Sequence, residues 1–282
     1  MAIRVPLRVE LLGGFRMFLD GHSPARLPNA RQQQIIAFLV LYARSSPILR
    51  QRVGGSLWPE STDDQALTNL RRELHHLREG WPSLDALVDV SSRTLGWRVE
   101  ADAMVDLLAF EAAADRGLDG DRAALEEASR LYKGDLLPEC GGEWIEADRE
   151  GLRQRAKKVL TRLVGLLEDS RAFGEAIEHA QRLLRIDQVD EHAWCALMRC
   201  HARRGERATA LHLYQQCAAA LKKELGVQPS APTRITYREI LDLDATTPVV
   251  PAPPRTALYP LVGRQSEWQS LLNAWRAATP GC

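Results

Sequence analysis

Apolar residues recur every three or four positions between Leu57 and Gly80, which is the spacing of one face of an α-helix. The apolar stripe consists of Ala66, Leu67, Leu70, Leu74 and Leu77. Favoured N-cap residues precede it, namely Ser61, Thr62 and Asp63. Because Gly80 and Pro82 are typical helix stops, the pattern predicts a helix from Asp64 to Glu79 with one buried face.

The opposite face of this helix is polar and carries side chains that suit DNA. It comprises Gln65, Thr68, Asn69, Arg72, His75 and His76, with Arg71 and Arg78 at its edges. Arginine reads guanine with two hydrogen bonds, asparagine and glutamine read adenine, and threonine contacts the thymine methyl. An ordinary amphipathic helix with a solvated face gives the same pattern, so the neighbouring elements must decide.

The pattern around this helix predicts a small α+β domain. Alternating residues predict strands over Leu7–Leu12 and Phe15–Leu19, joined by a two-residue hairpin turn at Gly13-Gly14. A turn at Asp20-Gly21 and a short strand at Ala25–Leu27 follow. Two helices are then expected at Arg31–Arg44 and Arg50–Leu57. After the long helix, strands at Ala86–Val90 and Leu95–Val99 flank a polar tip.

This order of elements is that of a winged helix-turn-helix, which places its third helix in the major groove and its hairpin beside the DNA backbone or minor groove. Arg93 lies at the hairpin tip, where it is positioned for a phosphate or minor-groove contact. A solvated turn arginine is an equally good interpretation of Arg93 alone.

Residues 101–245 show a helical pattern with an internal repeat. Helices are expected at Val105–Ala114, Arg122–Tyr132, Trp144–Asp169, Phe173–Ile186, Glu191–Arg204, Glu206–Leu225 and Pro232–Leu243. Leu163 and Leu197, like Ala176 and Ala210, lie 34 residues apart, which is the tetratricopeptide period. Two such repeats cannot bury a core, so the preceding helices must complete the stack. The stack is interpreted as a partner-binding or self-association surface, with a simple spacer as the alternative.

Charge and cysteine content restrict the class of protein. Residues 1–100 carry 13 arginines against 10 acids, whereas residues 101–150 carry 5 basic and 14 acidic groups. A DNA-binding surface must therefore be local. The five cysteines form no CxxC pair, which favours reduced thiols, and no segment approaches the length of an apolar transmembrane span. A soluble cytoplasmic protein with no membrane association is expected.

Three motifs in residues 7–245 resemble the bacterial antibiotic-regulatory transcriptional activators, whose N-terminal part is an OmpR/PhoB-type winged helix. They are Leu57-Trp58-Pro59, Asn69-Leu70-Arg71-Arg72-Glu73-Leu74-His75-His76-Leu77-Arg78 and Arg93-Thr94-Leu95-Gly96-Trp97-Arg98. The resemblance implies that a helical bacterial transcriptional activator domain follows, with roles in dimerisation and regulation and with RNA polymerase as a partner. Gly54-Gly55 departs from the family pattern, which favours better helix formers in the short helix.

The C-terminal part contains a proline-rich linker and the start of another pattern. Residues 246–260 form the linker, and Leu261-Val262-Gly263-Arg264 resembles the opening of a signal-transduction ATPase module. No GxxxxGK[ST] phosphate loop occurs in the chain, so we expect no ATP hydrolysis. Because no catalytic or metal-binding motif is present either, the sequence predicts a protein that is not an enzyme and needs no cofactor.

The sequence thus predicts a mainly α protein with a winged helix at 1–100, a tetratricopeptide-like domain at 101–245, the linker, and a truncated ATPase-like stump at 261–282. Its expected function is to bind promoter DNA as a transcriptional regulator, an activator by family resemblance, and as a homodimer. The expected base contacts are Thr68, Asn69 and Arg72. The expected backbone contacts are Arg50, Arg52, Arg71, His75, Arg78 and Arg93. The alternative is a scaffold whose winged helix docks a protein partner.

Overall fold

The computed structural model describes residues 7–19, 28–81, 85, 87–98, 103–243 and 265–278. The predicted turn at Asp20-Gly21, the strand at Ala25–Leu27 and the proline-rich linker lie outside these residues. The chain divides into two units, Met1–Tyr237 and Arg238–Cys282. The second unit contains α11 (Gln265–Ala278), in which Trp268 is exposed.

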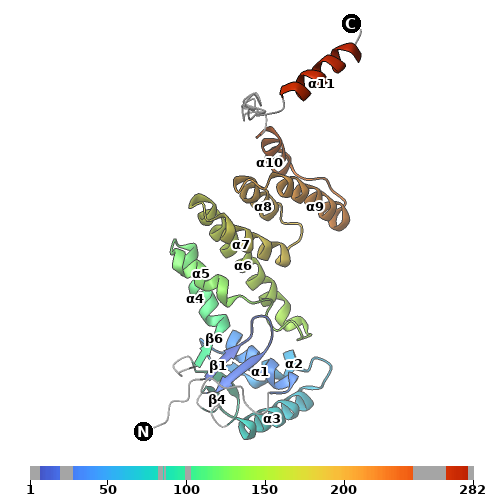
Figure 1. Ribbon diagram of the computed structural model, residues 1–282. Helices are drawn as coiled ribbons and strands as arrows, with labels where there is room; N and C mark the ends of the chain where they lie inside the picture. Colours follow the sequence, from blue (N-terminus) through green and yellow to red (C-terminus); the bar gives the residue numbers. More distant parts are fainter. Residues whose placement is uncertain are drawn as a thin grey trace. The chain divides into compact units, whose positions relative to one another are not determined.

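The predicted helix-turn-helix is confirmed (Figure 1). Its elements are α1 (Ala30–Tyr42), α2 (Arg50–Leu57) and α3 (Asp63–Gly80). An asparagine capping box starts α1, because the Asn29 side chain accepts from the Gln32 backbone while the Gln32 side chain accepts from the Asn29 backbone. Ile35, Ile36 and Leu39 of α1 are buried, as the apolar pattern requires.

The predicted hairpin is present and belongs to a three-stranded sheet. The strands are β3 (Ile48–Leu49), β4 (Val88–Val90) and β5 (Thr94–Trp97), in the order β3-β5-β4. Val90 pairs with Leu95, so the antiparallel register leaves a tight turn at Ser92 and Arg93. Ile48 pairs with Leu95 on the other side, which attaches the wing to the start of α2.

A second sheet has the order β2-β1-β6 and corrects two predictions. It consists of β1 (Leu7–Glu10), β2 (Arg16–Leu19) and β6 (Ala103–Val105). The last β1–β2 pair is Glu10 with Arg16, so the connection is five residues long and the predicted two-residue turn is wrong. Residues 103–105 were expected to be loop and helix, but they form a strand parallel to β1.

The longer connection has a physical reason, since its backbone bonds outside the hairpin. Leu12 bridges to Leu136, and the Gly13 N–H donates to the Asp135 carbonyl at 2.8 Å. Gly13 has φ +83°, and a Cβ there would lie 3.2 Å from the Lys133 backbone. The glycine is therefore required both by its conformation and by the close approach of the two segments.

The helical part contains the expected stack of packed neighbours (Figure 1). Its helices are α4 (Asp106–Leu118), α5 (Arg122–Leu131), α6 (Glu143–Asp169), α7 (Phe173–Ile186), α8 (Glu191–Arg203), α9 (Arg207–Leu225) and α10 (Ala231–Asp242). Leu163 and Leu197 are buried, as are Ala176 and Ala210, so positions 34 residues apart do occupy equivalent core sites. One continuous apolar core runs from β1 to α9, and α4 and α5 complete it.

Candidate nucleic-acid interface

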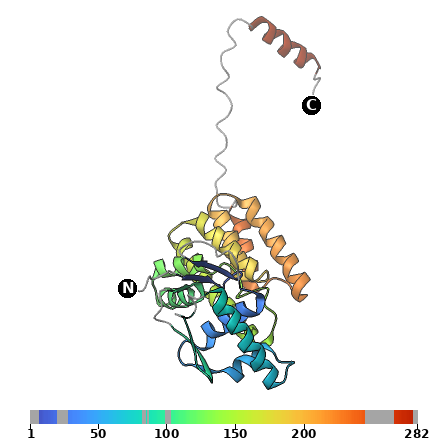
Figure 2. The ribbon, with the colours of Figure 1, turned by 90° about the horizontal axis from the view of Figure 1, so that it is seen from below.

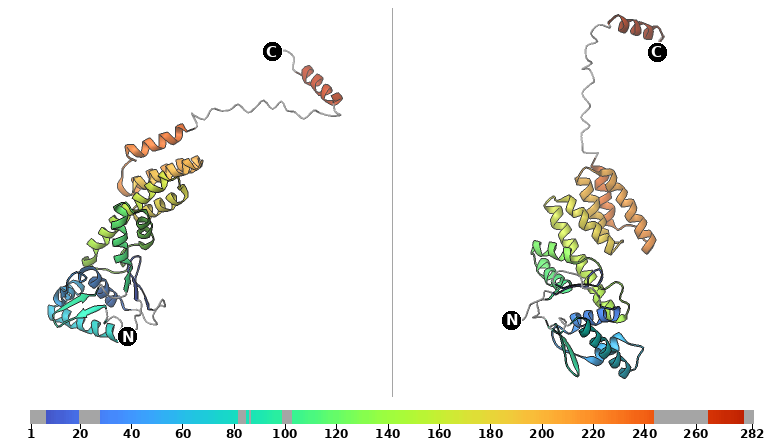
Figure 3. Two further views of the ribbon diagram at one scale, coloured as in Figure 1. Left: turned by 90° about the vertical axis from the view of Figure 1, so that its left-hand side faces the viewer. Right: turned by 60° about the horizontal axis from the view of Figure 1, so that its bottom comes forward.

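The long helix α3 is held by a cap at one end and by an apolar stripe along its length. The Thr62 side chain accepts from the Gln65 N–H, which caps the helix, and Asp63 and Asp64 lie in its first turn. Ala66, Leu70, Leu74 and Leu77 are buried as predicted, whereas Leu67 is half-buried. In Figures 1 and 3, α3 lies at the opposite end of its unit from α8 and α9.

Gly54 lets α2 pack closely under α3. It is buried, and a Cβ at this position would be only 3.4 Å from the Ala66 Cβ, so two small residues meet where the helices cross. The departure from the family pattern at Gly54 is therefore accommodated by the packing. Gly55, in contrast, faces open space and plays no such part.

The three side chains predicted to contact bases lie on the face of α3 that turns away from the core. Thr68 and Arg72 are exposed and Asn69 is half-buried, and Figure 2 shows no other helix or strand in front of α3. The Thr68 hydroxyl donates to the Asp64 carbonyl at 2.8 Å, and the residue is exposed. The Asn69 side-chain oxygen accepts from the Gln65 amide at 3.1 Å. This face thus offers amides, a methyl group and a guanidinium.

The Arg72 side chain remains exposed although the acidic Glu73 lies beside it. Its side chain is 62% exposed, and the Arg72 Nε lies 3.7 Å from a Glu73 carboxylate oxygen. Glu73 itself accepts hydrogen bonds from Asn29 and Gln32 of the α1 cap. A solvent-exposed pair at this distance contributes little to stability, so the guanidinium is free to exchange partners. The His75 Nε2 likewise lies 3.3 Å from a Glu79 carboxylate oxygen, and both side chains are exposed.

Three arginines from α2 and α3 gather beside the wing. Burial is the main cause that lowers the pKa of Arg50, and the positive charges of Arg71 and Arg78 lower it further. The positive charges of Arg71 and Arg78 therefore act on the Arg50 guanidinium. The Arg50 Nε is buried and donates to no atom of the described residues. Positive charges held close together repel one another, and a bound anion would reduce that repulsion.

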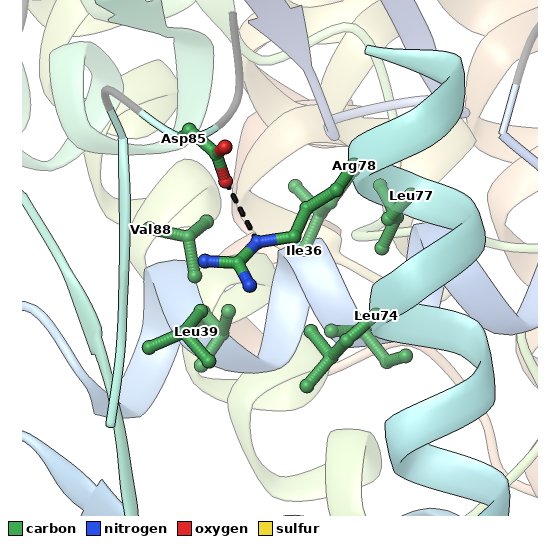
Figure 4. A pocket seen from close by; sticks show the side chains of 9 residues that line it. Ile36, Leu39, Leu74, Leu77, Arg78, Asp85 and Val88 are labelled. Carbon is green, nitrogen blue, oxygen red and sulfur yellow. Dashed lines mark hydrogen bonds and ion pairs between the residues drawn. The ribbon is translucent and has the colours of Figure 1, made fainter. Parts of the chain in front are cut away.

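Arg78 also bridges α3 to the segment before β4. Its Nε donates to Asp85 at 2.8 Å, and Figure 4 shows the guanidinium crossing an apolar pocket to reach that carboxylate. The pocket is lined by apolar side chains of α1, α3 and β4, among them Leu39, Leu74 and Val88. The contact orients Arg78. Among the residues drawn in Figure 4, the two terminal nitrogens of its guanidinium make no hydrogen bond or ion pair.

The wing tip is built to present Arg93. The Ser91 hydroxyl accepts from the backbone N–H groups of Arg93 and Thr94 at 3.2 and 2.8 Å, which fixes the turn. The Arg50 backbone N–H donates to the Arg93 carbonyl at 3.0 Å. The backbone of the wing tip is therefore bonded to the start of α2, and the Arg93 side chain is exposed.

Arg52 does not join this surface. Its guanidinium lies 5.5 Å from the centre of the Tyr42 ring, and Tyr42 donates to the Trp144 carbonyl at 2.9 Å and to Asp148. Burial, followed by Asp148, raises the pKa of Tyr42. Arg52 thus lies against Tyr42, which bonds to the helical part.

Two carboxylates at the junction with the helical part escaped the sequence analysis. Asp106 is buried and accepts the N–H groups of Leu11 and Leu12 at 2.8 and 3.0 Å. Burial raises its pKa more than these hydrogen bonds lower it. Glu10 is also buried, but Lys133 and Arg8 outweigh its burial and hold its pKa below the usual range. Only the fold brings these partners together.

The cysteines, the possible metal ligands and the apolar helices bear on other kinds of site. The four described cysteines are buried, and burial raises the pKa of the Cys200 and Cys217 thiols to about 12. Across the described ranges, no cluster of three or more histidine, cysteine or acidic residues is arranged to hold a metal ion. No helix of the described residues has the length and apolarity to cross a bilayer.

The architecture defines a winged-helix protein joined to a tetratricopeptide-like helical stack. Comparisons with known proteins agree: residues 104–241 match the model of the bacterial transcriptional activator domain. The chain is 27% identical to the regulatory protein DnrI of Streptomyces peucetius, over 89% of this chain and all of DnrI. It is also 27% identical to the regulatory protein AfsR of Streptomyces coelicolor, over 84% of this chain, which spans only 24% of the length of AfsR.

A solved structure supports the same fold. Mycobacterium tuberculosis EmbR, determined in complex with a low-affinity phosphopeptide, superposes with a TM-score of 0.63 and 20% identity, covering 84% of this chain and 65% of EmbR. Residues 104–241 thus carry the bacterial transcriptional activator domain, and the chain as a whole is similar to the regulatory proteins DnrI and AfsR. Both relatives are regulatory proteins.

Proposed function

We propose that this protein is a sequence-specific DNA-binding transcriptional regulator that acts in the bacterial cytoplasm. In this proposal α3 enters the major groove, with Thr68, Asn69 and Arg72 facing base edges. Arg50, Arg71 and Arg78 bind phosphates, His75 adds a contact at the groove edge, and the wing places Arg93 on the backbone or in the minor groove.

The observation that carries the proposal is the arginine cluster next to an uncovered polar helix face. Burial lowers the pKa of Arg50, and the positive charges of Arg71 and Arg78 lower it further. The backbone of Arg50 is bonded to that of Arg93. A row of phosphates would satisfy the unpartnered Arg50 Nε and relieve the repulsion. The cluster is local, which fits a chain whose formal net charge is zero.

The helical stack would supply the regulatory contacts. We propose that it pairs two copies of the chain on repeated half-sites or contacts RNA polymerase, as the family resemblance implies. The boundaries at residues 100 and 245 belong to this proposal, as does activation rather than repression. The strand β6 and the Leu12–Leu136 bridge join the winged helix directly to the helical part. Binding at either part would therefore act on a shared set of backbone hydrogen bonds.

DNA selection from a random library, performed with the full chain at two salt concentrations, tests the proposal. We expect enrichment of repeated half-sites separated by one or more helical turns. Recovery of only sequence-independent, salt-sensitive binding would instead favour the scaffold alternative.

An Arg93→Ala variant examines the wing. It should weaken binding about equally on all selected sites and reduce the dependence of affinity on salt by roughly one phosphate contact. Arg116→Ala on α4 is the matched control, because Arg116 is an exposed arginine paired with Glu127 outside the interface. A loss restricted to some sequences, or an equal loss in the control, would contradict the role of Arg93.

A further inference from the structure

A polar cleft lies between the loop after α5 and the last turn of α7, away from α3 and the wing. Four cationic side chains line it, Lys133, Arg153, Arg182 and Arg185, with Asp135 as the one lining carboxylate. Its volume is about 350 Å³, enough for a small organic molecule rather than a single water. The cleft was not recognised from the sequence.

The carboxylate is already neutralised by its neighbours. Arg153 donates from Nη2 to Asp135 at 2.5 Å, and the Tyr132 hydroxyl donates to the same residue at 3.0 Å. The hydrogen bond from Arg153 is the main cause that holds the pKa of Asp135 below its usual range. Lys133 is similarly paired with Glu10 at 2.9 Å. Asp135 therefore leaves the charge of α7 uncompensated.

The two arginines of α7 have no acidic partner. Among the described residues, no carboxylate lies within ion-pair distance of Arg182 or Arg185. Arg182 is half-buried and donates to the Ser129 hydroxyl and carbonyl, both at 2.6 Å, and to the Tyr132 carbonyl at 2.9 Å. These bonds fix the guanidinium rigidly, whereas Arg185 is exposed.

The positive charges of Arg182 and Arg185 favour the binding of an anion. Burial lowers the pKa of Arg182, and the charge of Arg185 lowers it further, so two cations are held close together at a cost. An oxyanion would offset that repulsion, and planar guanidinium groups suit phosphate oxygens in particular. Because Arg182 is fixed in advance by backbone carbonyls, little side-chain entropy is lost on binding.

We propose that this cleft is a binding site for a small phosphate-bearing molecule, held by Arg182 and Arg185 and closed on one side by Lys133. The site is distinct from the interface proposed for DNA, because it lies on α5, α6 and α7. The Lys133–Asp135 loop that borders it also holds the turn between β1 and β2, through Asp135 and Gly13. A ligand would therefore contact a segment packed against the winged helix.

Isothermal titration of the full chain with pyrophosphate, in buffers of matched ionic strength and without DNA, tests this site. The variant is Arg185→Gln, since Arg182→Gln would also remove three structural hydrogen bonds. The matched control is Arg203→Gln, because Arg203 is likewise an exposed arginine in the last turn of a helix. Citrate serves as a non-phosphate anion.

We expect saturable binding of pyrophosphate, a loss of about tenfold or more in affinity in Arg185→Gln, and no change in Arg203→Gln. The absence of saturable binding, an equal loss in both variants, or an equal affinity for citrate would overturn the proposal. The measurement contains no DNA, so its failure would leave the proposed DNA-binding function untouched, and failure of that function would not affect it.

Discussion

Substitution of Asp106 by asparagine should loosen the attachment of the winged helix to the helical stack. The Asp106 Oδ1 accepts from Leu11 and Leu107 at 2.8 and 2.7 Å, and its Oδ2 accepts from Leu12 at 3.0 Å. Asparagine keeps one oxygen, and its amide group would face a backbone N–H. One buried donor therefore loses its acceptor.

The expected cost follows from two opposing effects. A buried donor left without an acceptor costs about 1–3 kcal/mol, and Leu11 and Leu12 are too buried for water to replace the carboxylate. Burial raises the pKa of Asp106, however, so the charged form is itself disfavoured and a neutral side chain recovers part of that penalty. We therefore expect a loss of roughly 1–2 kcal/mol in the free energy of unfolding.

Urea denaturation of the full chain near neutral pH, followed by tryptophan fluorescence, measures this loss. The matched control is Asp119→Asn, because Asp119 is an exposed aspartate at the end of α4, and this change should alter stability by less than about 0.5 kcal/mol. If the two variants were equally stable, the junction hydrogen bonds would not carry the stability assigned to them.

Two further predictions concern the interface and the junction. Arg72→Ala should cost about 1–3 kcal/mol on the preferred site and relax selectivity at one base pair, and an unchanged selected sequence would contradict base contact by Arg72. Glu10 has a lowered pKa, so its ionised form stabilises the fold above the unfolded pKa and this contribution is lost as the pH falls through the folded pKa. The difference in unfolding free energy between the wild type and Glu10→Gln should therefore shrink in acid, and a difference independent of pH would argue against the Glu10–Lys133 and Glu10–Arg8 pairs.

Local patterns were sufficient wherever one face of an element meets the core. The α3 stripe, the bounds of α2 and α7, and the positions 34 residues apart in α6 and α8 all follow from helical spacing. Each of these features depends on residues within one or two neighbouring elements. Because burial acts on every residue of such a stripe, the prediction does not depend on knowing the partner.

The errors occur where the decisive partner is distant in the chain. Gly13-Gly14 has the composition of a two-residue turn, but the segment bonds to residues near position 135 instead. Residues 103–105 are too short to read as a strand until β1 is beside them. Asp106 likewise resembles an ordinary first-turn acid, although it binds a backbone about 95 residues away.

The candidate interface shows a limit of a different kind. Arg50 and Arg52 are both expected to contact the DNA backbone, yet positions two residues apart in a helix differ by about 200° in direction. The helical spacing alone could therefore have separated them, and the structure places Arg52 over Tyr42. Their grouping with Arg71 and Arg78 needed the packing of α2 against α3, which spacing does not reveal.

Several contacts connect the helical stack to the part of the winged helix on which α3 packs. Glu10 with Lys133 anchors one side of the winged helix, and Arg44 with Glu111 at 2.5 Å anchors another, at the end of α1. Tyr42 adds a third contact from α1 to Trp144 at the start of α6. α3 packs on α1 through Leu74 and Leu77, within the same apolar core as the helical stack. The helical stack and the winged helix are thus joined by ion pairs, a hydrogen bond and a shared apolar core.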